Sequence, residues 1–138
     1  MNFVTLGQWL VGAELRWFRL WLALGIALLA AVFYLSLTPP IAVPTEHFDK
    51  IYHAATYAVM MGWFVQLYRG VRSHAVLAIG FILMGILIEV LQGFHPMRYF
   101  DILDMIANAV GVGVAWLIGR TGFSTILSRV ELTLLSRS

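Results

Sequence analysis

The sequence contains no cysteine, and only 12% of its 138 residues are charged. Without cysteine there is no disulfide, no thiolate metal site and no cysteine nucleophile. Soluble globular domains usually have about 25% charged residues, so this low charge argues against that class. The net charge is only +2 and the basic residues are scattered. A nucleic-acid partner is therefore not expected, because such proteins neutralise phosphates with clustered Lys and Arg.

What the sequence has in abundance is apolar side chains, which make up 61% of the residues. They gather in four runs, at about residues 17–37, 49–68, 73–92 and 101–119. Each run is close to the about 20 residues that a helix needs to cross a bilayer. We predict an all-α fold, in which residues 1–138 form one integral membrane domain with a bundle of four transmembrane helices.

The basic residues predict how this bundle is oriented. One side of a four-helix chain would carry Arg16, Arg19, Arg69, Arg72, Arg120, Arg129 and Arg137. The other side would carry Lys50 and Arg98 alone. Because Lys and Arg accumulate in cytoplasmic loops, we expect both termini to be cytoplasmic. After the last run, residues 121–135 place apolar side chains at near-helical spacing, with Glu131 among the polar residues on other faces. This amphipathic tail is expected along the inner membrane surface, and a loosely ordered tail is the alternative.

Small residues recur four apart in the last run, at Ala107, Gly111, Ala115 and Gly119. Such a ridge lets two helix backbones approach closely inside a membrane. We expect it to mark a helix–helix contact.

The predicted topology brings polar residues from three helix ends and one loop to the outer surface. They are Asp49, Lys50, His53, Tyr57, Glu89, Gln92, Arg98, Asp101, Asp104 and Asn108. Within each helix their spacing of three or four puts them on one face. We predict that they line one extracytoplasmic pocket.

Glu89 is the least expected of these residues, because apolar residues surround it in the sequence. A charged carboxylate near the bilayer centre costs about 2.5–3.5 kcal/mol, and less near the edge. Glu89 therefore needs a proton or a partner, and His53, Lys50 and Arg98 are available. The alternative is a purely structural network that neutralises charge and holds the helix register. For Asp101 alone, capping of the last helix is a sufficient explanation.

A metal site is a further alternative, since one histidine and several carboxylates can hold Zn²⁺ or a harder cation. Zinc sites usually offer a pair of ligands on one helix, and His53 is the single helical histidine near the carboxylates. The sequence therefore predicts neither a metal nor a cofactor.

Three stretches of the chain resemble the signatures of the VanZ-like membrane proteins: "DKIYHAATY", "IEVLQ" and "PMRYFDILDMIANAVG". The resemblance covers about residues 35–119, with Ala54 and Met97 departing from the usual pattern. It implies a small multi-pass protein of the bacterial cytoplasmic (inner) membrane. Founding members of the family are associated with reduced susceptibility to glycopeptide antibiotics, teicoplanin in particular.

Three functions are compatible with the predicted pocket. It could bind an envelope amphiphile, such as a lipid-linked cell-wall precursor or a lipoglycopeptide, with Lys50 and Arg98 holding an anionic head group. It could instead belong to an enzyme of lipid head groups, with Glu89 or Asp104 as general base oriented by His53. A proton- or ion-coupled transporter is the third, and with four helices per chain it would need a homo-oligomer. We favour the binding function, with membrane lipids or a lipid-linked molecule as the partner.

Overall fold

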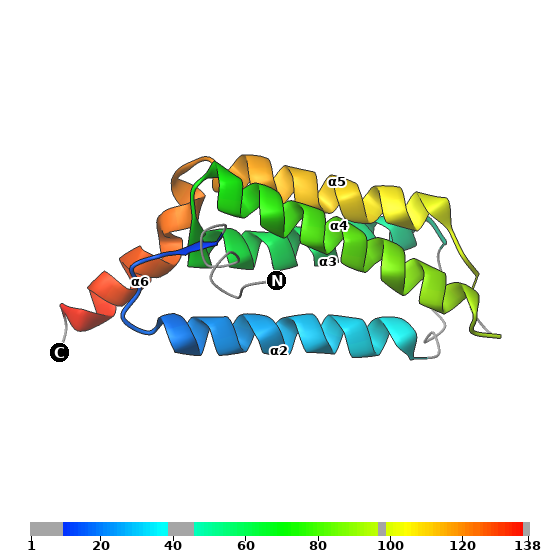
Figure 1. The fold of residues 1–138 in the computed structure, drawn as a ribbon, viewed down its shortest axis with the longest axis horizontal. Coiled ribbons are helices and arrows are strands. Elements are labelled where there is room, and N and C mark those ends of the chain that lie inside the picture. Colours follow the sequence, from blue (N-terminus) through cyan, green and yellow to red (C-terminus); the bar gives the residue numbers. More distant parts are fainter. Residues whose placement is uncertain (1–9, 39–45, 97–98, 137–138) are drawn as a thin grey trace, which may run out of the picture.

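The computed structural model describes residues 10–38, 46–96 and 99–136, without the side chains of Val11, Glu46 and His47. Four long helices lie side by side and alternate in direction (Figure 1). They are α2 (Phe18–Leu37), α3 (Glu46–Leu67), α4 (Val71–Gly93) and α5 (Ile102–Gly119). Each of them covers one of the four apolar runs of the sequence, so the all-α prediction is confirmed.

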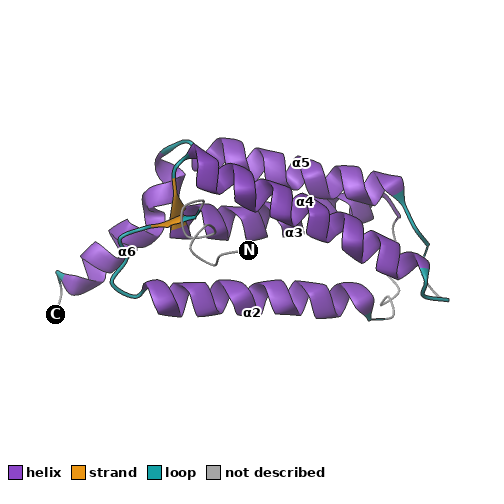
Figure 2. Cartoon of the chain, viewed as in Figure 1, coloured by secondary structure: helices purple, strands orange, loops and turns teal. Residues whose placement is uncertain are grey.

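Two short strands are the exception to the helical structure in the described ranges (Figure 2). The strands β1 (Val11–Gly12) and β2 (Tyr68–Arg69) pair antiparallel at the end of the bundle where α3 ends. Gly70 links β2 to α4 with a φ of 88°, a conformation that favours glycine. The turn between α3 and α4 is therefore tight.

The helix ends follow from local chemistry. At the end of α2, Thr38 has an extended backbone, as the residue before a proline prefers. At the start of α5, the Asp101 carboxylate accepts a hydrogen bond from the Leu103 N–H at 2.8 Å. This N-cap satisfies one of the amide donors that a helix start leaves unpaired.

Helix α3 is the central element of the bundle and packs against α2, α4 and α5. It supplies much of the core, including Tyr57, Met60, Met61, Phe64, Val65 and Leu67. Its closest neighbour is α5, where Gly111 faces the backbone of Ala54. A Cβ atom built on Gly111 would lie 2.0 Å from the Ala54 carbonyl oxygen. The small-residue ridge is thus a helix contact, as predicted.

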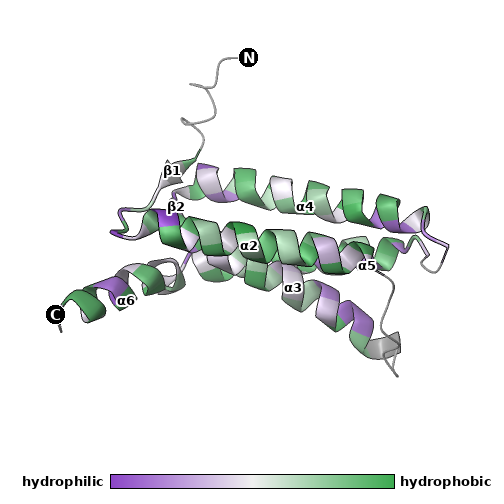
Figure 3. Ribbon diagram, turned by 90° about the horizontal axis from the view of Figure 1, so that it is seen from below, coloured by the Kyte–Doolittle hydropathy of each residue, from purple (hydrophilic) through white to green (hydrophobic). Residues whose placement is uncertain are grey.

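Three described helices are long and apolar enough to cross a membrane, namely α2, α4 and α5. Their outward faces are apolar, with exposed side chains such as Leu24, Leu83 and Val110. Helix α3 has the required length but is less apolar, because its first turns carry Asp49, Lys50 and His53. Figure 3 shows this hydrophilic start of α3 beside the apolar surfaces of the other helices.

The tail after α5 folds back as a short 3₁₀ helix, η1 (Gly122–Thr125), followed by α6 (Ile126–Leu135). Glu131 on α6 is buried, contrary to its expected place on a polar face. Its carboxylate accepts hydrogen bonds from the Arg16 N–H at 2.7 Å, the Trp17 N–H at 2.9 Å and the Trp21 indole N–H at 2.7 Å. Burial by itself would raise the pKa of Glu131, but these hydrogen bonds hold it below its usual value. The tail therefore caps the N-terminus of α2, where a negative charge is favoured.

Candidate functional site

The polar residues predicted from the sequence meet at one end of the bundle. Because the helices alternate in direction, the starts of α3 and α5 and the end of α4 lie together, at the right of Figure 1. The contacts below involve nine of the ten predicted residues. Arg98 lies outside the described residues.

Lys50 is the centre of the charged network. Its ammonium group forms ion pairs with Asp49 at 3.5 Å, with Asp101 at 2.5 Å and with Asp104. The pairing with Lys50 and the hydrogen bond from the Leu103 N–H lower the pKa of Asp101. Lys50 thus joins α3 to the first turn of α5.

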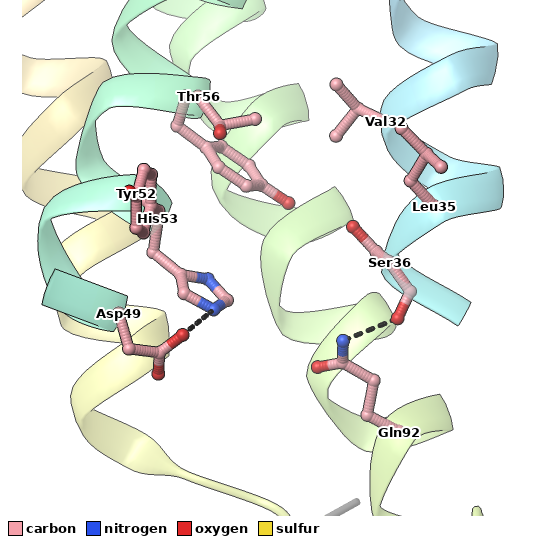
Figure 4. A pocket seen from close by; sticks show the side chains of 9 residues that line it. Val32, Leu35, Ser36, Asp49, Tyr52, His53, Thr56 and Gln92 are labelled. Carbon is pink, nitrogen blue, oxygen red and sulfur yellow. Dashed lines mark hydrogen bonds and ion pairs between the residues drawn. The ribbon is translucent and has the colours of Figure 1, made fainter. Parts of the chain in front are cut away.

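His53 lies one turn further along α3 and contacts α5 through both ring nitrogens. Its Nδ1 is 3.1 Å from Asn108 Oδ1. Its Nε2 is 3.6 Å from Asp104 Oδ2 and 3.8 Å from Asp49 Oδ1. Figure 4 shows the imidazole directed toward Asp49, with the dashed line marking their contact. Asp49, His53 and Asp104 each offer one ligand atom within 4.8 Å of the others.

Glu89 is fully enclosed, with 1% of its surface exposed. Its Oε1 accepts the Asp101 N–H at 2.9 Å, whereas its Oε2 has no hydrogen-bond partner among the described residues. The sequence offered Lys50 as a partner for Glu89, but Lys50 is engaged with Asp101 and Asp104. The described partner of Glu89 is instead a backbone amide, which no side-chain pattern reveals.

Gln92 and Tyr57 lie on the side of the site that faces α2. The Gln92 side-chain amide donates to the Ser36 carbonyl at 2.6 Å and ties α4 to α2 (Figure 4). Tyr57 is 3% exposed, and its hydroxyl has no hydrogen-bond partner in the described ranges. A Cβ on Gly85 would lie 3.2 Å from both the Tyr57 hydroxyl and Asn108 Nδ2. Gly85 therefore makes room for these two polar groups.

A cavity of about 250 Å³ opens between α2, α3 and α4 next to His53. It is lined by Val32, Leu35, Ser36, Asp49, Tyr52, His53, Thr56, Tyr57 and Gln92. One wall is polar and the other, on α2, is mainly apolar (Figure 4). This arrangement can accept the part of an amphiphilic molecule where its polar head group joins its apolar chain.

Sequence reasoning missed five of these lining residues: Val32, Leu35, Ser36, Tyr52 and Thr56. On α3 a signal was available, since Asp49, Tyr52, His53 and Thr56 follow the spacing of a single helix face. On α2 there was none, because Val32 and Leu35 are ordinary residues of an apolar run. Only the packing of α2 against α4 brings them to the cavity.

Comparison with known proteins gives the chain a family. The sequence profile of the family described as VanZ/LLP1 matches residues 3–123. A curated protein of Schizosaccharomyces pombe, itself described as uncharacterized, is 27% identical over 114 residues. That match covers 80% of this chain and 69% of the relative. No solved structure matches. The profile spans most of the chain, including all three signature stretches, and the chain belongs to the VanZ/LLP1 family.

Proposed function

We propose that the cavity beside His53 binds the polar part of an envelope amphiphile. The observation that carries the proposal is the cavity itself, which has a polar wall on α3 and an apolar wall on α2. Its volume of about 250 Å³ is below the about 300–1,000 Å³ of pockets that enclose drug-sized ligands. A head group fits this space, and the attached chain would continue along the apolar outer surface of α2.

The proposed setting is the bacterial cytoplasmic membrane, with α3 as a fourth span and both termini inside. Helix α3 supports this topology because it lies among the three apolar helices along its length (Figure 1). The distribution of arginines supports an extracytoplasmic position for the cavity. Lipid-linked cell-wall precursors and lipoglycopeptides such as teicoplanin are amphiphiles of that side. Lower susceptibility to teicoplanin is the expected phenotype of the chain.

The charged network modifies how such a ligand would be held. Lys50 is shared by three carboxylates, so it has little capacity left for an anionic head group. Hydrogen-bonding groups on the cavity wall, such as Thr56 and Tyr57, are better placed to recognise a polar head group.

The test is mass spectrometry of the lipids that copurify with the protein in mild detergent. Thr56→Leu fills the cavity, whereas Ala55→Leu introduces the same leucine at the neighbouring exposed position outside it. We expect one class of amphiphile to copurify with the wild type and with Ala55→Leu, and to be lost from Thr56→Leu. Equal lipid content in all three proteins would refute binding in the cavity.

An enzyme of lipid head groups is the second candidate. It is favoured by the Glu89 carboxylate oxygen and the Tyr57 hydroxyl, two buried polar atoms for which the described structure provides no partner. Such groups often serve in functional sites. Incubation of the copurified amphiphile with wild type and Glu89→Gln, followed by product analysis, distinguishes catalysis from binding.

A further inference from the structure

We propose that Asp49, His53 and Asp104 bind one divalent transition-metal ion at the wall of the cavity. The ion would be held by one imidazole nitrogen and two carboxylate oxygens, a ligand set that suits Zn²⁺. The site deepens the proposed function, since the ion's open positions would face the head group. Metal binding itself can be measured without any amphiphile.

Two of the three distances between the ligand atoms are close to those of a metal site, and the third, between the two carboxylates, is within 4.8 Å. His53 Nε2 lies 3.6 Å from Asp104 Oδ2 and 3.8 Å from Asp49 Oδ1. Zinc–ligand bonds of about 2.0–2.2 Å at tetrahedral angles separate two ligand atoms by about 3.3–3.6 Å. Both observed separations exceed the range of a hydrogen bond. The two gaps around His53 Nε2 are thus too wide for a hydrogen bond and close to the ligand spacing around a bridging cation.

The contact with Asn108 prepares His53 for this role. The Asn108 Oδ1 atom can only accept a hydrogen bond, so the His53 Nδ1 that lies 3.1 Å away carries the proton. In the neutral imidazole, Nε2 then keeps its lone pair and points it toward two carboxylate oxygens. A lone pair between two carboxylates is repelled, so this nitrogen needs either a proton or a metal ion at that position. Metal-bound histidines are oriented in this way by a second hydrogen bond at the other nitrogen.

The local charge also favours a cation. Asp49, Asp101 and Asp104 share the single ammonium group of Lys50. Lys50 contacts Oδ1 of Asp104 and leaves Oδ2 facing His53. Within the described part of the chain, Lys50 is the lysine or arginine that pairs with these carboxylates, and the negative charge that remains is partly buried, where an uncompensated charge is costly. A divalent ion on the far side of Asp104 would neutralise it.

A second observation points to a ligand at the same place. Tyr57 lines the cavity together with Asp49 and His53, is 3% exposed, and its hydroxyl has no partner within the described part of the chain. Buried hydroxyl groups are rarely left without a hydrogen bond. A polar group of a ligand bound in this cavity would provide one. The ion would also allow a phosphate or carboxylate to bind beside an acidic network that otherwise repels it.

The experiment uses the full chain in detergent, with any affinity tag removed and bound metals stripped by a chelator. Zn²⁺ is titrated without any amphiphile, in a buffer that contains salt and excess Mg²⁺. Both suppress the non-specific attraction of Zn²⁺ to carboxylates. We expect one Zn²⁺ per chain, and Co²⁺ in its place should show the visible absorption of a tetrahedral site. His53→Gln and Asp104→Asn should lower the Zn²⁺ affinity by more than about 100-fold. Asn108 orients His53 but does not bind the ion itself. Asn108→Ala should therefore lower the Zn²⁺ affinity by about 10–100-fold.

His95→Gln is the matched control, because it removes a histidine that follows α4 at the same end of the bundle but outside the three ligands. Its Zn²⁺ affinity should equal that of the wild type. Asp49→Asn removes a ligand at a position where misfolding is not expected, since half of the Asp49 side chain is exposed and the change should not disturb packing. Helical content and elution as a single species confirm the fold of each variant.

Two results would overturn the proposal. One is the absence of saturable Zn²⁺ binding by the wild type under these conditions. The other is unchanged affinity in folded Asp49→Asn and His53→Gln. The copurifying amphiphile is measured separately on the same samples. A wild type that copurifies with the amphiphile but binds no Zn²⁺ refutes the metal site alone, and a wild type that binds Zn²⁺ but copurifies with no amphiphile refutes the cavity function alone.

Discussion

The contact between α3 and α5 leads to the most direct structural prediction. Replacing Gly111 by alanine would place a Cβ atom 2.0 Å from the Ala54 carbonyl oxygen and 2.8 Å from its carbonyl carbon. The obstacle is backbone, so no side-chain rotation can relieve the clash. The two helices must move apart, and Gly111→Ala should destabilise the bundle.

The magnitude follows from the geometry. A carbon–oxygen contact between helices is normally about 3.3–3.6 Å, so the helices must separate locally by more than about 1 Å. Overpacking of this kind costs about 1–3 kcal/mol, and more where the backbone cannot adjust. The higher helix propensity of alanine offsets at most about 1 kcal/mol. We expect a net loss of about 1–3 kcal/mol in the free energy of unfolding.

Gly113→Ala is the matched control on the same helix. A Cβ on Gly113 has no atom within 4 Å among the described residues. This variant should be as stable as the wild type, or more stable by up to about 1 kcal/mol. Thermal unfolding of both variants in the same detergent measures the difference.

The same substitution should also weaken the site, because α3 carries His53 and α5 carries Asn108 and Asp104. Separation of the helices would lengthen the 3.1 Å contact between His53 and Asn108. Gly111→Ala should therefore bind Zn²⁺ more weakly than Gly113→Ala. Equal melting temperatures for the two variants would refute the close approach of α3 and α5.

Three further predictions concern other parts of the chain. Glu131→Gln should lower stability by about 1–3 kcal/mol, because an amide replaces a charged acceptor of three hydrogen bonds. The lowered pKa of Glu131 means that its contribution is present above the unfolded-state value and is lost as the pH falls through the folded-state value. Melting curves of wild type and Glu131→Gln should therefore converge in acid, and a constant difference would contradict this. Lys50→Met should raise the affinity for Zn²⁺, since it frees Asp104 and removes a competing cation, and a lower affinity in the folded variant would count against the metal site. For topology, a single cysteine at Pro96 should react with an impermeant thiol reagent in intact cells and one at Ser136 should not. The opposite labelling would invert the proposed orientation.

Much of this molecule can be predicted from the sequence because membrane length and helix periodicity are local properties. The four helices follow from apolar runs of the required length, and Pro39 ends the first of them. Spacings of three and four residues place Asp49 and His53 on one face of α3, and Asp104 and Asn108 on one face of α5. Alternating helix directions then bring both faces to the same end.

The partners within the site were decided by tertiary structure. How far a helix is rotated about its axis, and how close it lies to the next, depends on packing that no single helix contains. The close approach at Gly111 lets His53 reach Asn108 and lets Lys50 pair with Asp101 and Asp104 rather than Glu89.

The contributions of α2 and the tail were also visible only in the fold. Val32 and Leu35 become a cavity wall because Gln92 ties α4 to α2 at Ser36. Glu131, which its spacing placed on a polar face, is buried because the unpaired amides at the start of α2 attract a carboxylate. Helix periodicity determines which residues share a face, whereas the packing of helices determines what that face meets.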